Sequence, residues 1–145
     1  MVQIVEAAEV TPALVDAFER LTPQLSLSNP APDAHMLGAI IGSDACHLLI
    51  ATGENGAIVG TLTLIVFPIP TGWRGWIEDV IVDEAASGQG IGRQLTEHAL
   101  DLARDCGCTT VDLTSRPSRE AANHLYKKVG FEPRETNVYR YDLRA

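Results

Sequence analysis

The chain has 145 residues, of which 46% are hydrophobic and 21% charged, so it can form one domain with its own core, and its composition excludes a disordered or fibrous protein. Its formal net charge of -8 argues against nucleic acid and anionic lipid as partners, because both are negatively charged. The first residues lack the pattern of a secretory signal, and no apolar run reaches the roughly 20 residues that cross a bilayer. We therefore expect one cytoplasmic domain, residues 1–145, with neither a nucleic-acid nor a membrane partner.

Strands and helices are predicted along the whole chain. Residues 3–6 alternate apolar and polar side chains, Thr11 and Pro12 start a helix as N-cap and first-turn proline, and Asp33 can cap another. Strands are expected at 3–6, 47–51, 57–67, 75–82, 109–114 and 137–143, and helices at 11–21, 33–41, 90–106 and 118–129. The proline-rich residues 22–33 form either the border of a substrate pocket or a plain surface connection.

This order of elements predicts a single α/β (α+β) domain. The two strands around the turn Glu54-Asn55-Gly56 form a hairpin. The helix 90–106 connects two further strands as a crossover, which makes them a parallel pair. We expect a mixed, mostly antiparallel sheet with a central parallel strand pair, flanked by about four helices and closed by residues 137–143.

Cysteine and histidine residues show no metal-binding pattern. The three cysteines are odd in number and lack a second pair at zinc spacing, so we interpret them as small apolar residues in a reducing compartment. The four histidines are scattered along the chain. These residues are Cys46, Cys106, Cys108, His35, His47, His98 and His124. We expect no metal site.

The most informative stretch is the strand Ile77–Val82 followed by Gly88-Gln89-Gly90-Ile91-Gly92-Arg93. A strand that passes through a glycine loop into a helix directs free backbone N–H groups and the positive end of the helix dipole at one point. Glycine allows positive φ and lets a pyrophosphate approach the backbone. The pattern therefore predicts an anion site, although glycines also form ordinary turns.

Two other phosphate-binding loops do not fit this stretch. A P-loop ends in Gly-Lys-Ser or Gly-Lys-Thr, whereas Gly92 is followed by Arg93-Gln94. A dinucleotide fingerprint has glycines spaced by two and then three residues, whereas Gly88, Gly90 and Gly92 are spaced by two and two. The spacing argues against both kinds of nucleotide site.

Two motifs in the right order resemble the GNAT superfamily of N-acetyltransferases, over nearly the whole chain and most strongly over 76–131. The first is Ser87-Gly88-Gln89-Gly90-Ile91-Gly92, which is similar to the family's pyrophosphate loop except that Ser87 replaces an Arg or Gln. The second is Ala122-Asn123-His124-Leu125-Tyr126-Lys127-Lys128-Val129-Gly130-Phe131. The pattern Ile77-Glu78-Asp79-Val80 also resembles members that act on small molecules, such as polyamine and glucosamine-6-phosphate acetyltransferases.

The resemblance implies an acetyl-CoA site and its residues. In the family the pantetheine arm adds to the strand before the loop, which implies backbone contacts from Val80 and Val82. Asn123 lies one turn before Tyr126, where its amide could bond CoA. The full set of expected acetyl-CoA contacts is Val80, Ile81, Val82, Ser87, Gly88, Gln89, Gly90, Ile91, Gly92, Arg93 and Asn123.

Acetyl transfer to an amine also needs an acid and a proton acceptor. We choose Tyr126 as general acid for the thiolate, since a phenol with a reference pKa of about 10 stays protonated at neutral pH; its alternative role is packing alone. Glu78 is the candidate that accepts the amine proton, through water. Strand alternation predicts that Asp79 points to the opposite face.

The resemblance implies an acetyl-CoA-dependent N-acetyltransferase that acts on a primary amine of a small molecule by direct attack in a ternary complex. Two alternatives stay open: an acetyltransferase for protein lysines or N-termini, and a non-catalytic acyl-CoA sensor. A homodimer is also open.

Overall fold

The computed structural model describes residues 2–144. Five strands form one mixed sheet in the order β1-β2-β3-β4-β5, in which β4 and β5 are parallel and all other neighbours antiparallel. The strands are β1 (Gln3–Glu6), β2 (Cys46–Thr52), β3 (Ile58–Ile69), β4 (Gly72–Val82) and β5 (Thr110–Asp112). The helices are α1 (Pro12–Leu25), α2 (Ala34–Ile41), the short 3-10 turn η1 (Glu84–Ala86), α3 (Ile91–Asp105) and α4 (Glu120–Val129). The mixed α/β fold expected from the sequence is confirmed.

Local signals in the sequence explain where the helices begin. The Thr11 side chain accepts a hydrogen bond from the Leu14 N–H at 3.1 Å, and Asp33 accepts one from Met36 at 2.8 Å, so both predicted N-caps form. Helix α1 continues past its predicted end near Leu21 to Leu25. That extra turn carries Leu25 to the border of the site described below.

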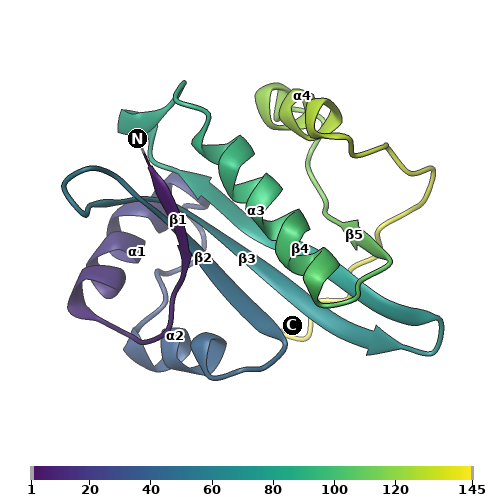
Figure 1. Cartoon of the computed structure of the whole chain (residues 1–145), viewed down its shortest axis with the longest axis horizontal. Coiled ribbons are helices and arrows are strands. Elements are labelled where there is room, and N and C mark those ends of the chain that lie inside the picture. Colours follow the sequence, from purple (N-terminus) through teal and green to yellow (C-terminus); the bar gives the residue numbers. More distant parts are fainter. Residues whose placement is uncertain (1, 145) are drawn as a thin grey trace.

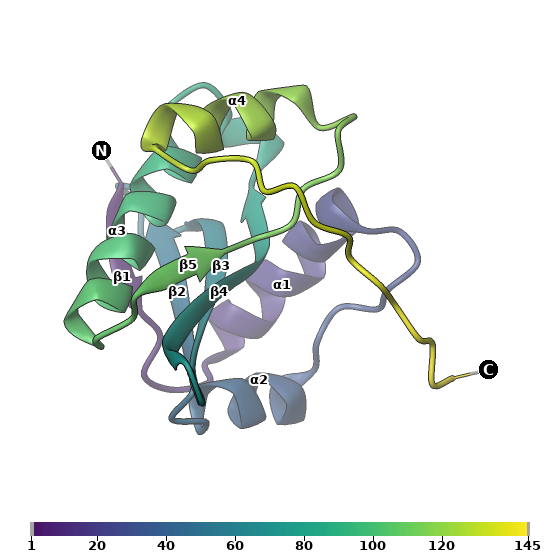
Figure 2. The ribbon, with the colours of Figure 1, turned by 90° about the vertical axis from the view of Figure 1, so that its right-hand side faces the viewer.

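Helices cover both faces of the sheet (Figures 1 and 2). On one face, α3 buries Ile91, Leu95 and Ala99 against Leu62 and Leu64 of β3. On the other face, α1 and α2 bury a second cluster. Its members are Leu14, Ala17, Phe18, Leu21 and Leu37 from the helices and Leu48, Ile58 and Ile81 from the strands. Two cores thus fix the sheet from both sides and hold α3, which follows the glycine loop.

A glycine of β3 lets α3 approach the sheet closely. A Cβ on Gly60 would lie 3.1 Å from side-chain atoms of both Ile91 and Leu95. Any larger residue there would push the first turn of α3 outward, so Gly60 sets the distance between the loop and the sheet.

One predicted strand is absent from the sheet, and the parallel pair lies elsewhere than expected. Residues 137–143 were expected to close the sheet, but they pair with no strand among residues 2–144 and extend away from the domain (Figure 2). The prediction of a closing strand is wrong. The alternating side chains of residues 137–143 indicate an extended backbone, but they do not specify a strand with which it pairs. As a result, the β4–β5 pair lies at the edge of the sheet and not at its centre.

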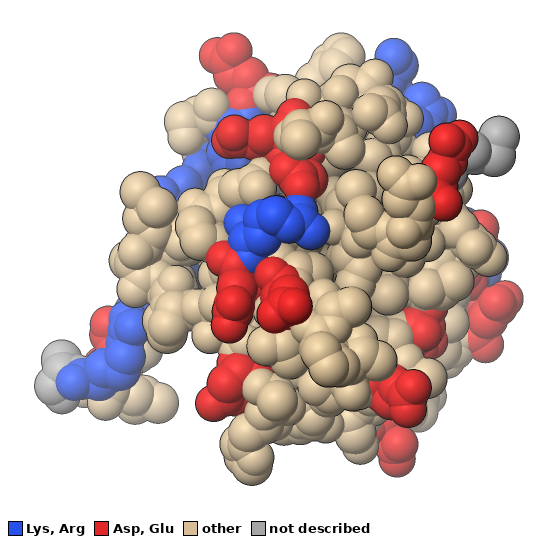
Figure 3. All heavy atoms as spheres, turned by 90° about the vertical axis from the view of Figure 1, so that its left-hand side faces the viewer, with Lys and Arg blue, Asp and Glu red and all other residues tan. Residues whose placement is uncertain are grey.

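Within the described residues, no helix is long and apolar enough to span a bilayer. Acidic side chains are spread over the face drawn in Figure 3, with fewer basic ones among them, as the net charge of -8 requires.

Candidate active site between β4 and the start of α4

Strands β4 and β5 separate beside the site. They pair only from Arg74–Trp76 to Thr110–Asp112. Beyond Trp76, no strand in the described part of the chain pairs with this side of β4, so backbone groups of residues 77–82 are free there to bond an extended ligand. The geometry agrees with the expected backbone role of Val80 and Val82.

A β-bulge in β4 changes the direction of its side chains. Glu78 lies opposite Thr63 and Ile81 opposite Thr61, so β4 has one extra residue in this interval. Asp79 has φ of 51° and is the one residue besides glycine with positive φ in the described chain. The prediction that Asp79 points away from Glu78 is therefore wrong: both border the same cavity.

That cavity brings the predicted catalytic residues together. It has a volume of about 120 Å³ and connects β4 with the segment after β5 and with α4. Its lining residues are Leu25, Ile77, Glu78, Asp79, Val80, Leu113, Thr114, Arg119 and Tyr126. Leu113 and Thr114 were not expected in the site, since their role depends on where β5 diverges from β4.

The two carboxylates of the cavity differ in their environment. Glu78 Oε1 accepts a hydrogen bond from Trp76 Nε1 at 2.8 Å, which holds the side chain on its strand. Partial burial, and next the negative charge of Glu78, raise the pKa of Asp79 above its ordinary value. Asp79 is consequently a stronger proton acceptor than an ordinary aspartate.

Tyr126 is fixed by packing and directed at the same cavity. Only 8% of the residue is exposed, and its ring meets Phe131 edge to face with centroids 5.8 Å apart. Burial raises the pKa of the phenol, while the nearby charge of Arg119 opposes that shift. No hydrogen bond joins its hydroxyl to another residue in the range 2–144. Tyr126 therefore has a packing role and an unused hydroxyl donor.

The glycine loop has the geometry of an anion site. Gly88 and Gly90 have φ of 78° and 75°, and a Cβ on either would meet no protein atom within 4 Å. Gly90 is the N-cap of α3 and gives no side-chain cap, so N–H groups of the first helical turn stay available. Ile91, 2% exposed, anchors that turn in the core. The two glycines therefore allow positive φ and leave open space beside the loop, and they are not needed to avoid a protein neighbour.

A cluster from α1 holds the segment just before the loop. Arg20 forms an ion pair with Asp83 and donates a hydrogen bond to the Ile58 carbonyl oxygen at 2.8 Å. The Glu84 N–H donates to Gln24 Oε1 at 2.9 Å, and Asp83 Oδ1 also accepts from the Ala85 N–H at 3.1 Å. Sequence patterns do not reveal this cluster, because Arg20 lies 63 positions from Asp83 and Gln24 lies 60 positions from Glu84.

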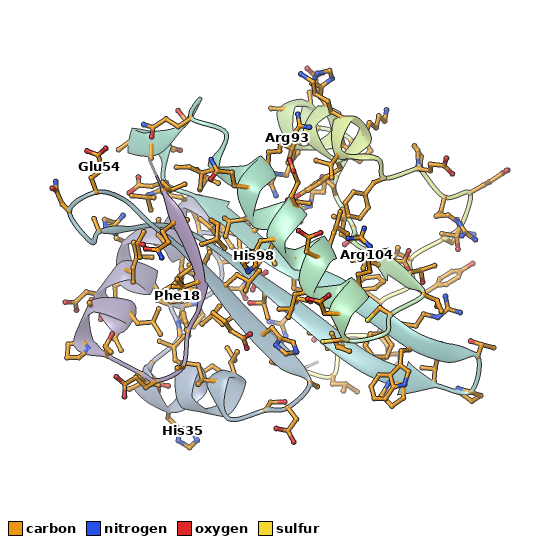
Figure 4. All side chains as sticks on the ribbon, viewed as in Figure 1. Phe18, His35, Glu54, Arg93, His98 and Arg104 are labelled. Atoms are coloured by element: carbon orange, nitrogen blue, oxygen red, sulfur yellow. The ribbon has the colours of Figure 1, made fainter. Side chains whose placement is uncertain are left out.

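Other expected acetyl-CoA contacts differ in what they offer. Arg93 Nε pairs with Glu97 Oε1 at 2.6 Å on the surface of α3 (Figure 4), which leaves the terminal guanidinium nitrogens and the backbone N–H for a ligand. Ile81 turns its side chain into the second core and offers backbone only. Ser87 and Gln89 are exposed in the loop.

Asn123 has a structural task in this arrangement. Its amide nitrogen donates to the carbonyl oxygens of Arg116 at 2.9 Å and Arg119 at 2.8 Å, and to Ser115 Oγ at 3.3 Å. It therefore shapes the turn into α4, and a contact with CoA falls to its Oδ1 atom.

In the part of the chain that the structure describes, no three His, Cys, Asp or Glu residues are placed to hold a metal ion. The three cysteines are free, and Cys106 and Cys108 pack against the first core.

Comparison with known proteins agrees with this fold. The Acetyltransferase (GNAT) family matches residues 12–131. Glucosamine 6-phosphate N-acetyltransferase 1 of Oryza sativa subsp. japonica is 29% identical over 94% of this chain and 83% of its own. Glucosamine 6-phosphate N-acetyltransferase of Trypanosoma brucei brucei is 34% identical over 82% of this chain and 76% of its own. The crystal structure of a Trypanosoma brucei acetyltransferase superposes with a TM-score of 0.79 at 25% identity, covering 99% of this chain and 100% of that one.

The family match and these relatives define an acyltransferase. The chain belongs to the GNAT family of acetyltransferases, and its activity is N-acetylation.

Proposed function

We propose that the chain binds acetyl-CoA between the glycine loop and the free side of β4, and transfers its acetyl group to the primary amine of a small molecule. The observation that carries this proposal is the cavity in which Glu78, Asp79 and Tyr126 meet beside unpaired β4 backbone. An anion-binding loop at one end of that strand and proton-transfer groups at the bulge are the two halves that the reaction needs.

The donor half uses backbone groups. N–H groups around Gly88, Gly90 and the first turn of α3 hold the pyrophosphate, and residues 80–82 hold the pantetheine arm as an added strand. The bulge at Asp79 breaks the regular ladder, which leaves backbone groups free to polarise the thioester carbonyl. Acetyl-CoA supplies an acetyl thioester whose leaving group is a thiolate.

The acceptor half uses the carboxylate pair. Two carboxylates in one cavity attract a protonated amine, and the amine must lose a proton before it attacks. The raised pKa of Asp79 makes it a stronger acceptor of that proton than an ordinary aspartate, directly or through water. We therefore assign to Asp79 the role of proton acceptor. Glu78, which Trp76 holds in place, orients the amine.

Tyr126 serves the departing sulfur. Its hydroxyl is directed at the cavity, and its raised pKa keeps it protonated at neutral pH. It donates its hydrogen to the sulfur as negative charge develops there. The protonated amine loses two protons over one turnover: one replaces the proton that Tyr126 gives to the sulfur, and the other is released to solvent from the carboxylate.

Two observations favour a small amine over a protein. The cavity of about 120 Å³ admits an amino group and its neighbouring carbons, with Leu25 of α1 on one side. The relatives from Oryza sativa and Trypanosoma brucei are named for the acetylation of an amino sugar phosphate.

The test is thiol release from acetyl-CoA over a panel of amino sugars, polyamines, aminophosphonates, amino acids and peptides. We expect turnover with one class of small amine and none with peptides. Turnover with peptides alone would replace the small amine by a protein acceptor. Binding of acetyl-CoA without turnover on any amine would favour the acyl-CoA sensor.

A further inference from the structure

Strands β3 and β4 carry apolar side chains that lie outside both cores. Ile65 of β3 lies opposite Trp76 of β4. Their neighbours Leu64 and Ile77 also lie opposite each other and belong to the core beneath α3. Because side chains alternate between the two faces of a strand, Ile65 and Trp76 point to the other face, on which α1 and α2 lie (Figure 2).

The two helices do not bury this part of the face. The core that they form with the sheet includes Ile81 of β4, but within residues 2–144 neither core includes Ile65, Phe67 or Trp76. These three residues are partly exposed, and Phe67 follows Ile65 on the same face of β3. We name Ile65, Phe67 and Trp76 the apolar platform.

The apolar platform adjoins the active-site cavity. Trp76 precedes Glu78 by two residues on the same face of β4, and its Nε1 donates a hydrogen bond to Glu78 Oε1 at 2.8 Å. Two residues span about 7 Å along a strand. A ligand whose amine lies at Glu78 therefore reaches the indole of Trp76 with the carbon atoms that follow the amine.

The indole of Trp76 has an open face and acidic neighbours. Among the described residues, the one pair of stacked or edge-to-face rings is Tyr126 with Phe131, so no ring of the chain packs on Trp76. Asp112 of β5 is exposed and lies next to Trp76 in the parallel pair. An aromatic plane with carboxylates on two sides fits a flat ligand that has an apolar face and donor groups at its edge.

We infer that Trp76 is a specificity-determining residue of the acceptor site: the acceptor carries its primary amine on a ring, and the face of that ring stacks on the indole. The inference rests on the proposed function, because it takes the amine to lie at Glu78. The ring face covers the apolar platform, and donor groups at the ring edge bond Asp112. A sugar ring and an aromatic ring share this chemistry, and the test separates them.

The test compares amines that share an amino group and differ by a ring. Glucosamine is paired with ethanolamine, and benzylamine with methylamine, and kcat/KM for each amine is measured by thiol release from acetyl-CoA. Trp76→Leu removes both the stacking surface and the hydrogen bond to Glu78. Loss of the hydrogen bond lowers kcat/KM for both amines of a pair alike, so the ratio within a pair isolates the contact with the ring.

In the wild type we expect kcat/KM for a ring amine to exceed that of its ring-free partner at least about tenfold, and Trp76→Leu to bring the ratio close to one. A preference in the glucosamine pair identifies a sugar ring, and one in the benzylamine pair an aromatic ring. The matched control is Trp73→Leu, the other tryptophan, which points to the opposite face of β4 and should keep the wild-type ratio. Wild-type ratios near one, an unchanged ratio in Trp76→Leu, or an equal loss in Trp73→Leu would overturn the inference.

A binding measurement separates this inference from the proposed function. Absence of turnover with every amine counts against the proposed function, and binding then decides on Trp76. Trp73→Phe leaves Trp76 as the single tryptophan of the chain, and its fluorescence is followed as each amine is added with CoA present. We expect a saturable change with a ring amine and none with its ring-free partner. An unchanged signal with both ring amines would overturn the inference even where acetyl transfer is intact.

Discussion

At the residue scale, a substitution of Tyr126 can distinguish a catalytic role of this residue from a packing role. Its ring packs against Phe131 while its hydroxyl has no partner among residues 2–144, so removal of the oxygen alone separates the two roles. Replacement by phenylalanine keeps the ring contact.

We expect Tyr126→Phe to lower kcat by about 10² and to leave the acetyl-CoA dissociation constant unchanged, because the hydroxyl acts on the departing sulfur and not on binding. Steady-state kinetics and titration calorimetry measure the two quantities. Equal kcat in both proteins would leave Tyr126 with packing alone.

Asp79 combines a role in catalysis with a cost in stability. Burial and Glu78 raise its pKa in the folded protein above the unfolded value, so the folded state binds this proton more tightly. The stabilisation from this proton is therefore complete at pH below the pKa of Asp79 in the unfolded chain. It is lost as the pH rises through the raised pKa of the folded protein. At neutral pH the charged Asp79 destabilises the fold.

The change Asp79→Asn should raise Tm at pH 7 and reduce kcat/KM for the amine, since asparagine also tolerates positive φ but accepts no proton. The gain in Tm should vanish below pH 3.8, where the ordinary carboxyl is neutral as well. Thermal melts of both proteins from pH 3 to 8 measure this difference. A Tm at pH 7 below that of the wild type would contradict the assigned cause.

At the element scale, helix α1 holds residues 83 and 84, just before the glycine loop, through contacts of its side chains. The Arg20 side chain is 46% exposed and Asp83 only 14%, so loss of Arg20 leaves a mostly buried carboxylate without its ion pair. This links the first helix of the chain to the segment that starts the glycine loop.

We expect Arg20→Met to raise KM for acetyl-CoA several-fold with little change in kcat, and to cost about 1 kcal/mol of stability. The matched control is Arg104→Met, which removes an exposed pair with Asp101 at the far end of α3 and should change neither value. Equal effects of both variants would show that the contact with Asp83 does not position the loop.

Elements with local signals were predicted well, and features that depend on tertiary contacts were not. Thr11 and Asp33 marked helix starts, and Gly88 and Gly90 marked the positive-φ turns before α3, because caps and positive φ depend on neighbouring residues. The bulge at Asp79 has no such signature. One extra residue in a strand leaves the apolar pattern still recognisable as a strand, so the sequence does not indicate the bulge. The Arg20–Asp83 contact and the place of Thr114 depend on how distant segments meet.

At the scale of the whole molecule, the site is assembled from both halves of the chain. Helix α1 supplies Leu25, β4 supplies the carboxylates, the segment after β5 supplies Thr114, and α4 supplies Tyr126. The two cores hold these elements in register. Binding of acetyl-CoA is the property that the whole arrangement must show.

Titration calorimetry with acetyl-CoA tests this account most directly, with wild type, Gly90→Val and Gly56→Val. Both glycines have φ of 75° and no protein atom within 4 Å of an added Cβ, but Gly56 lies in the turn between β2 and β3. Valine strains either backbone equally, so only the place of the strain differs. We predict one site per chain in the wild type and in Gly56→Val, and loss of binding in Gly90→Val. Undiminished binding by Gly90→Val, or no binding by the wild type, would contradict the acetyl-CoA site.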